Sequence, residues 1–285
     1  MLKRHVKSVA NVAESVEKKR LALTVHGSER LALAEELAAL RGEWEREDFS
    51  LRLQIPEEKI LIISDAHIPY HDEGVIAHAF AKAKHLQVEA IVWLGDLLDH
   101  PTYSSWGVDD LSTTHMRELD IAEGIIRMAA KIVRRQYWSL GNHEERWFRK
   151  VGNQLGMEHL ARVAGLSDML KDGTLVTSDN PSLDYHNNEW LLTHPADYSG
   201  TPLTVPSELA EKFGRNVVGA HAHHWAQGKS KSGRFIVIES GGAFAPKLVK
   251  YTNHRVTRHR TWVQGYVILD HGQATLYEGS PVPDR

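Results

Sequence analysis

The chain of 285 residues contains no cysteine. This absence excludes disulfide bonds and thiolate metal ligands, so any transition metal must be bound by nitrogen and oxygen atoms. The sequence also lacks an apolar run of about 18 residues, the length that a membrane-spanning helix needs. Its first stretch, "MLKRHVKSVANVAESVEKKR", lacks the apolar centre of a signal peptide. We therefore expect a cytoplasmic protein with no membrane partner.

An excess of charge of one sign is missing as well. The formal net charge is −3, so the chain carries no global electrostatic footprint for nucleic acid. Apolar residues make up 42% and charged residues 25%, which is typical of a globular protein. A chain of this length can bury a large core, and one catalytic domain with an appendage is the simplest expectation.

The N-terminal residues differ in pattern from the rest of the chain. Leu33, Leu37, Leu40 and Trp44 recur on one helical face, and Ser28 is a suitable N-cap. We predict a helical appendage over residues 1–55, which packs on the body or on a second copy of the chain to form a homo-oligomer.

Residues 56–285 alternate helix and strand in their first half and are mainly strand in their second. "KILIIS" (59–64) and "VEAIVWL" (88–94) predict buried strands, with a helix over 71–85 between them. Helices over 117–135 and 144–164 flank a strand at 136–140. Further strands are predicted at 174–178, 189–193, 216–219, 234–240, 261–270 and 273–279. This order predicts an α/β fold with two packed mixed β-sheets flanked by helices.

Metal-capable side chains follow five of the predicted strands. Ligands favour the carboxyl ends of strands in α/β sheets, so these side chains are expected to meet at a metal site. In "VVGAHAHHW", extended backbone would turn His221 and His223 to one side and His224 to the other. The polar residues that follow these strands, of which all but Arg146 are metal-capable, are Asp65 and His67, then Asp96, Asp99 and His100, then Asn142, His143 and Arg146, then His194, and finally His221 and His223.

This ordered set resembles the calcineurin-like metallophosphoesterase superfamily, whose signature reads D-x-H, G-D-x-x-D, G-N-H-D/E, a lone His and G-H-x-H. The resemblance covers roughly residues 59–245 and leaves the N-terminal 50 residues outside. It implies a four-layer α/β/β/α sandwich and a dinuclear-metal-dependent phosphoester hydrolase. The matching elements are Asp65-Ala66-His67, Gly95-Asp96-Leu97-Leu98-Asp99, Gly141-Asn142-His143-Glu144, His194 and His221-Ala222-His223.

The sequence departs from the signature at three places. Ala220 separates Gly219 from His221, and Pro195 follows His194 where glycine is common. His186 competes with His194 for the lone-histidine position. His100 follows Asp99 where the protein serine/threonine phosphatases have arginine, which argues against a protein phosphatase.

The resemblance implies two divalent ions that share Asp96. One ion would be bound by Asp65, His67, Asp96 and His223, and the other by Asp96, Asn142, His194 and His221. Oxygen and imidazole ligands suit Mn²⁺, which we favour, and also Fe or Zn²⁺. A bridging hydroxide would attack phosphorus.

His143 would be the catalytic acid, and Asp99 would hold its ring in the required tautomer. Asp99 could instead be a helix N-cap, and Asn142 a turn residue. His100, Tyr103 and Arg146 are candidate substrate contacts, although Tyr103 could only pack a loop and Arg146 could pair with Glu145.

The substrate class has two main alternatives. We expect a phosphodiesterase acting on a nucleic acid or nucleotide-type substrate. A phosphomonoesterase acting on a nucleotide, small molecule or phosphoprotein is the alternative, and a non-catalytic metal-binding scaffold is the third. The basic stretch "KLVKYTNHRVTRHR" (247–260) suits a phosphodiester backbone, or is a solvated strand face.

Overall fold

The computed structural model describes residues 29, 32–33, 35–37, 52–103, 114–152, 155–249 and 262–279. The chain divides into two compact units, Met1–Phe49 and Ser50–Arg285. The described residues of the first unit are helical, and Leu33 and Leu37 in it are exposed. Ser28, Leu40 and Trp44 lie outside the described residues, so the predicted cap and most of the apolar face stay predictions, as does the packing of this appendage.

The first sheet of the second unit has the strand order β12-β11-β2-β3-β4-β5. Strands β2 to β5 run parallel, and β11 and β12 are antiparallel additions at one edge. Their bounds are β2 (Lys59–Ile63), β3 (Ala90–Leu94), β4 (Arg135–Ser139), β5 (Leu175–Ser178), β11 (Gly265–Asp270) and β12 (Gln273–Glu278). The apolar runs of β2 and β3 are buried on both faces, as parallel strands between two layers must be.

The second sheet has the strand order β1-β6-β7-β8-β10-β9, in which β7, β8 and β10 are parallel. Its bounds are β1 (Leu53–Ile55), β6 (Ser182–Tyr185), β7 (Trp190–Thr193), β8 (Asn216–Gly219), β9 (Trp225–Lys229) and β10 (Ile236–Ser240). Residues 53–55 were assigned to the appendage in the sequence analysis. They instead form β1, which pairs with β6 in this sheet.

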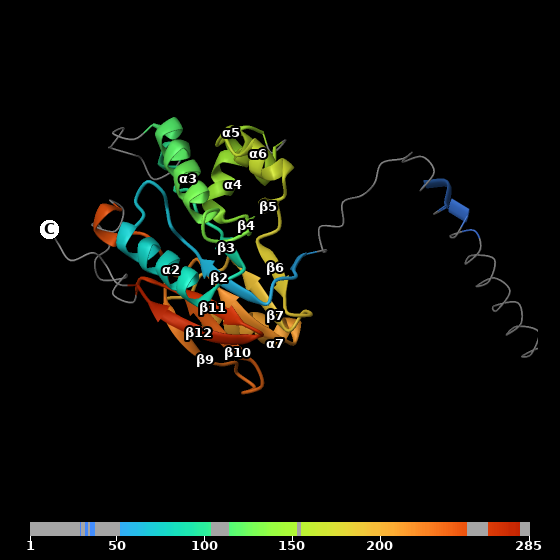
Figure 1. Ribbon diagram of the computed structural model, residues 1–285. Coiled ribbons are helices and arrows are strands. Elements are labelled where there is room, and N and C mark those ends of the chain that lie inside the picture. Colours follow the sequence, from blue (N-terminus) through green and yellow to red (C-terminus); the bar gives the residue numbers. More distant parts are fainter. Residues whose placement is uncertain are drawn as a thin grey trace, which may run out of the picture. The chain divides into compact units, whose positions relative to one another are not determined.

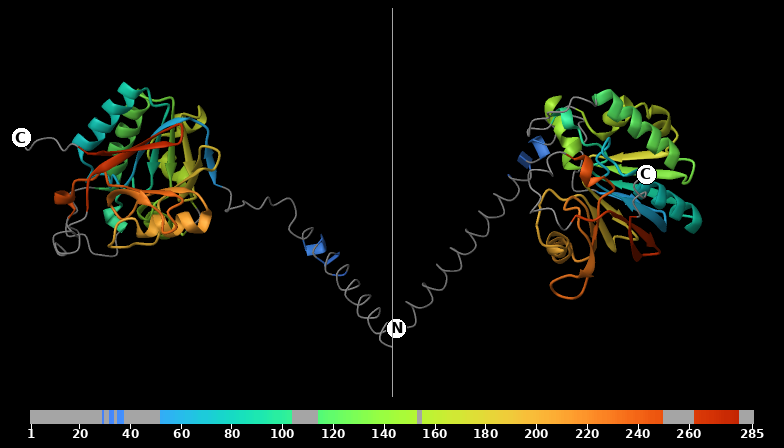
Figure 2. Two further views of the ribbon diagram at one scale, coloured as in Figure 1. Left: turned by 90° about the horizontal axis from the view of Figure 1, so that it is seen from below. Right: turned by 90° about the vertical axis from the view of Figure 1, so that its left-hand side faces the viewer.

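Helices cover the outer face of each sheet, which gives four layers (Figures 1 and 2). The first sheet carries α2 (Glu73–Leu86), α3 (His115–Ala129), α4 (Asn142–Lys150), α5 (Met157–Val163) and α6 (Ser167–Lys171), and the second carries α7 (Thr204–Phe213). Short 3-10 helices lie at Pro101–Tyr103 and Pro246–Leu248. The prediction of two mixed sheets flanked by helices is confirmed. Among the described residues, no helix has the length and apolar character needed to cross a bilayer.

The single helix predicted over 144–164 is wrong. It is two helices, because Gly152 adopts a left-handed φ of 83° after α4 and Gly156 is the N-cap of α5. The Asp179 carboxylate accepts a hydrogen bond from the first backbone N–H of α5, at Met157. A side chain far along the chain therefore fixes the second start, which periodicity alone does not reveal.

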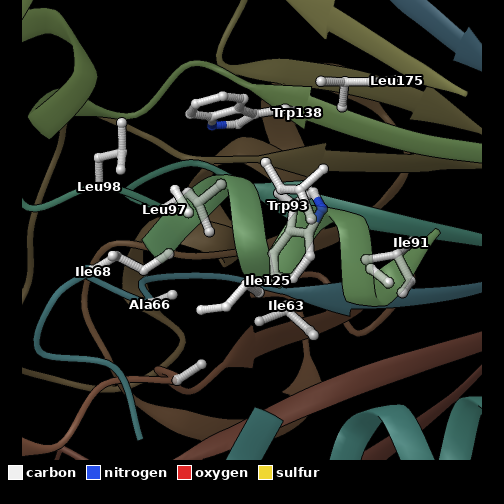
Figure 3. Packing of buried hydrophobic residues seen from close by; sticks show 14 of the residues in the cluster. Ile63, Ala66, Ile68, Ile91, Trp93, Leu97, Leu98, Ile125, Trp138 and Leu175 are labelled. Atoms are coloured by element: carbon white, nitrogen blue, oxygen red, sulfur yellow. The ribbon is translucent and has the colours of Figure 1, made fainter. Parts of the chain in front are cut away.

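Alternating residues of the central strands face different layers. Ile63, Ile91 and Trp93 pack under the helices, as Figure 3 shows, whereas Ile62 and Val92 pack against the second sheet. This is the period of two expected of strands. The core between the sheets thus fixes one sheet against the other, and with it the relative positions of their strand ends.

We predict that Ile62→Ala lowers the free energy of unfolding by about 2–5 kcal/mol, because it leaves a cavity between the two sheets. Met128→Ala is the matched control, since Met128 on α3 is 55% exposed and surface changes are usually within about 0.5 kcal/mol. Urea unfolding followed by tryptophan fluorescence measures both. Equal losses in the two variants would contradict the layered core.

Candidate functional site

The carboxyl ends of β2, β3 and β4 meet those of β7 and β8 at one edge of the sandwich. Backbone hydrogen bonds join neighbouring ends: His67 N–H donates to the Asp96 carbonyl at 3.0 Å, and Ala220 N–H to the Thr193 carbonyl at 3.0 Å. The segments that follow these strands bring together a group that we call the strand-end cluster: Asp65, His67, Asp96, Asn142, His143, His194, His221 and His223.

One half of the cluster consists of Asp65, His67 and His223, whose ligand atoms lie within 4.8 Å of one another. The Nε2 atoms of His67 and His223 are 3.2 Å apart. His223 Nε2 is 3.1 Å from Asp65 Oδ1. Two ring nitrogens and a carboxylate oxygen thus face a common point, as ligands of one cation do.

The other half consists of His194 and His221, which together with Asp96 form a second group of the same kind. His194 Nε2 is 3.3 Å from Asp96 Oδ2 and 3.1 Å from Asn142 Oδ1. Its Nδ1 faces the Leu94 carbonyl at 3.0 Å. A ring N–H donated to a carbonyl leaves the opposite nitrogen free to bind a metal, which is the usual support for a histidine ligand.

Asp96 lies between the two halves. Its Oδ2 is 3.3 Å from His194 Nε2 and 4.0 Å from His67 Nε2. The other oxygen, Oδ1, accepts a hydrogen bond of 2.8 Å from the His143 backbone N–H. One oxygen is therefore held by the backbone, and the other faces the ligands of both halves.

The buried polar atoms of the cluster fit divalent cations. Asp65 Oδ1 and Asp96 Oδ2 are buried without a hydrogen-bond partner among the described residues. Buried carboxylate oxygens without donors are costly, and a cation satisfies them. The donors are imidazole nitrogen, carboxylate and amide oxygen, a set that binds Mn²⁺, Fe or Zn²⁺.

Charge within the cluster is strongly coupled. Burial alone would raise the pKa of Asp65, but His223 and His194 lower it to about 2. Burial opposes protonation of His194, but Asp96 and Asp65 raise its pKa to about 10. Burial and the nearby His194 lower the pKa of His221 to about 4. The carboxylates thus demand positive charge, which protons on histidine supply when no metal does.

Asp99 lies beneath two histidines. Its Oδ1 is 3.0 Å from His67 Nδ1 and 3.2 Å from His143 Nδ1, and its carbonyl is 2.8 Å from the same His143 nitrogen. Burial would raise the pKa of Asp99, but these two rings hold it well below its usual range. Contact with His143 was expected, whereas contact with His67 was not. Asp99 caps no described helix.

The guanidinium of Arg146 lies against the His143 ring. Its Nη1 is 3.0 Å from Nδ1 and its Nη2 is 2.8 Å from Nε2. The alternative partner, Glu145, instead pairs with Arg149 at 2.6 Å. A half-buried cation therefore borders the cluster next to His143.

His100 and Tyr103, the other candidate substrate contacts, lie next to His115 of α3. His100 is buried beside Glu118 and His115, and the Tyr103 ring packs near it. His224 faces away from the cluster toward Glu239, at 3.0 Å. His186 lies 3.4 Å from Glu189 on the turn between β6 and β7, so His194 rather than His186 joins the cluster.

Glu144 has a structural role that was not predicted from its motif. Its buried carboxylate accepts hydrogen bonds from the backbone N–H groups of Asp96, Leu98 and Gly141, at 3.0, 3.1 and 3.1 Å. Burial and the nearby Asp96 raise its pKa. Its position three residues after Gly141, the N-cap of α4, is the sequence signal of a capping box.

Backbone conformation is unusual throughout the cluster. Asp65, His67, Asp96, His221 and His223 have φ values of 51°, 48°, 49°, 74° and 56°. Residues other than glycine rarely adopt this left-handed region, and each costs of order 1–3 kcal/mol where it is strained. Such residues gather at functional sites because the surrounding structure holds them.

Comparison with known proteins gives one family match, which covers most of the chain. Residues 58–258 match a family described as calcineurin-like phosphoesterase. No curated protein sequence matches the chain.

Solved structures of similar chains include a phosphoesterase, a phosphatase and a sorting protein. Yfce, a phosphoesterase from E. coli, is 13% identical, with a TM-score of 0.42 over 79% of this chain and 97% of its own. A dimetal phosphatase from Danio rerio is 11% identical, with a TM-score of 0.37 over 79% and 100%. Vps29 complexed with zinc, from Entamoeba histolytica, is 12% identical, with a TM-score of 0.37 over 77% and 91%.

We predict that Gly141→Ala disrupts the strand-end cluster. An added Cβ would lie 2.2 Å from the Asp96 backbone nitrogen and 2.3 Å from its Oδ1, so the loop after β3 must shift. Gly124→Ala is the matched control, because no atom lies within 4 Å of its new Cβ on the exposed face of α3.

Gly124→Ala should raise the free energy of unfolding by about 0.5–1 kcal/mol, since alanine is the better helix former. Metal content by mass spectrometry and urea unfolding should separate the variants. A Gly141→Ala protein with full metal content and stability would show that the close approach is unimportant.

Proposed function

Because the chain belongs to the calcineurin-like phosphoesterase family, we propose that it is a phosphodiesterase with two divalent cations in the strand-end cluster. The observation that carries this proposal is the position of Asp96, whose Oδ2 faces His194 at 3.3 Å and His67 at 4.0 Å and has no hydrogen-bond partner within the described part of the chain. A carboxylate placed between two ligand groups is suited to bridge two ions.

The ligands follow from the two halves of the cluster. Asp65, His67 and His223 would hold one ion, and Asn142, His194 and His221 the other, with Asp96 shared. Divalent ions in such a site polarise phosphoryl oxygens and make water a stronger nucleophile near neutral pH. We favour Mn²⁺, with Fe or Zn²⁺ as alternatives, because the donors are imidazole and oxygen.

His143 is the proposed acid. Its backbone N–H is tied to Asp96, and its Nδ1 faces the Asp99 carbonyl at 2.8 Å. A proton held at Nδ1 by Asp99 leaves Nε2 as the atom that exchanges a proton with the leaving group. Burial opposes protonation of His143, but Asp96 and Asp99 raise its pKa, which keeps a proton available.

Arg146 is proposed to bind a phosphoryl oxygen. Its guanidinium borders His143, and planar guanidinium groups bind phosphate oxygens with two parallel hydrogen bonds. For His143 to carry a proton on both ring nitrogens, Arg146 Nη1 and Nη2 must both leave the ring, and an arriving phosphate oxygen supplies the competing acceptor.

A diester is favoured over a monoester by the charge next to Asp99. A phosphomonoester carries close to two negative charges at neutral pH, because its second pKa is about 6. His100, the residue after Asp99, is buried with its ring toward Glu118, so it adds nothing to Arg146 in balancing the additional charge. We propose a nucleotide-type diester, with a phosphomonoester as the alternative substrate. Most of the basic stretch 247–260 lies outside the described residues and contributes nothing to this choice.

The ratio of two activities tests the substrate class. The Mn²⁺-loaded protein should hydrolyse bis-p-nitrophenyl phosphate with a higher kcat/KM than p-nitrophenyl phosphate, because one negative charge fewer needs to be balanced. Panels of nucleotide diesters and DNA extend the comparison. A higher kcat/KM for the monoester would favour the phosphomonoesterase, and metal binding without hydrolysis of either would favour the scaffold.

His143→Gln should keep both ions and lose turnover by about 10²–10⁴, the usual contribution of a positioned acid. The loss should be largest for alkyl and nucleoside leaving groups, which need a proton as the P–O bond breaks, and smaller for p-nitrophenol. Metal analysis and a leaving-group series measure these effects.

His85→Gln, a change at an exposed histidine of α2, is the matched control. Loss of metal in His143→Gln, or an equal rate loss for all leaving groups, would contradict the acid role.

A further inference from the structure

A second group of histidine and carboxylate side chains lies outside the strand-end cluster. His100 follows β3, His115 is the first residue of α3, and Glu118 lies one turn further along that helix. A nitrogen of each ring and a carboxylate oxygen lie within 4.8 Å of one another. We call these three residues the α3 cluster. His100 and Glu118 are buried, and the His115 side chain is 17% exposed.

The spacing of the donors matches that of ligands around one ion. Glu118 Oε2 is 3.6 Å from His100 Nδ1 and 3.4 Å from His115 Nδ1. Tetrahedral zinc with bonds of about 2.0–2.2 Å places neighbouring ligand atoms about 3.4 Å apart. The distances from Glu118 Oε2 to the two Nδ1 atoms therefore match those between ligands of one ion. They are too long for a strong hydrogen bond.

Three ring nitrogens of the α3 cluster lack a hydrogen-bond partner among the described residues. Both ring nitrogens of His100 and Nε2 of His115 are buried without a partner among the described residues. Glu118 Oε1 accepts the backbone N–H of His100 at 2.7 Å, which orients the carboxylate and turns Oε2 toward the two rings. A fully buried imidazole with neither nitrogen paired is costly, and a metal bond at one nitrogen offsets much of that cost.

A proton is the competing explanation. Burial opposes ionisation of Glu118, but the adjacent His100 and His115 lower its pKa, so a protonated histidine could balance its charge. One proton serves one ring, however, and the two rings approach Oε2 at nearly equal distances. A cation between them accounts for both approaches.

We propose that His100, His115 and Glu118 bind a third metal ion, Zn²⁺, at a site separate from the two catalytic ions. Two imidazoles and one carboxylate are a common ligand set for zinc, with a fourth position for water. The ion joins the segment after β3 to the first turn of α3. Because His100 directly follows Asp99, this ion also holds the residue that orients His67 and His143.

Zinc content tests the third site independently of catalysis. After loading with Zn²⁺ and exhaustive dialysis, the wild-type protein should retain three ions per chain and His115→Gln two. The His85→Gln control should retain three. In an Asp65→Asn/Asp96→Asn background, which weakens the strand-end cluster, one ion should remain and should disappear when His115→Gln is added.

Thermal unfolding provides a second measurement. Zn²⁺ should raise the Tm of the Asp65→Asn/Asp96→Asn protein, and His115→Gln should remove that increase. Circular dichroism confirms that each variant is folded, and Glu118→Gln gives a second removal of the site should His115→Gln fold poorly. Equal zinc content with and without His115→Gln, or no ion in the Asp65→Asn/Asp96→Asn protein, would overturn the third site. Failure of the two-ion proposal would change the total but not the difference that His115 makes.

Discussion

The buried carboxylate of Glu144 ties together the two loops on which the site depends. By accepting N–H groups from Asp96, Leu98 and Gly141, it holds the segment after β3 against the start of α4. That contact places the Asp96 carboxylate where it accepts the His143 backbone N–H. The orientation of the proposed bridge and the position of the proposed acid therefore both rest on one fully buried side chain. An unpaired carboxylate at this depth would be costly, so its three donors and its burial require each other.

The cluster depends on both sheets of the sandwich, because neither sheet holds all of its residues. Asp65, His67, Asp96 and Asn142 follow strands of the first sheet, whereas His194, His221 and His223 follow strands of the second. Contacts such as that of His194 Nδ1 with the Leu94 carbonyl cross from one sheet to the other. Packing between the sheets, through residues such as Ile62 and Val92, thus acts on the chemistry by setting the separation of the two halves.

The sequence predicted features that follow from the order of motifs along the chain. It did not predict side-chain contacts between segments that are distant in the sequence. Parallel strands bring their carboxyl ends to one edge, so Asp65, Asp96 and His221 could be expected together from their places alone. Glu144 was quoted within its motif without a role, because its partners are backbone groups of another loop. His100 is a candidate substrate contact because it follows Asp99, and that role stays a prediction. Its contacts with Glu118 and His115 were not foreseen, because those residues belong to a helix that begins fifteen residues later in the sequence.

The left-handed residues of the strand-end cluster limit which amino acids can occupy the motif. Glycine, asparagine, aspartate and histidine are the residue types that tolerate positive φ best, and three of these four also bind metals. The backbone conformation and metal binding therefore favour nearly the same few residue types at Asp65, His67, Asp96, His221 and His223. A related protein that no longer bound metals would still need these residue types to form the same loops. The motif would then be kept after the activity was lost, and its sequence alone could not distinguish an active enzyme from an inactive relative.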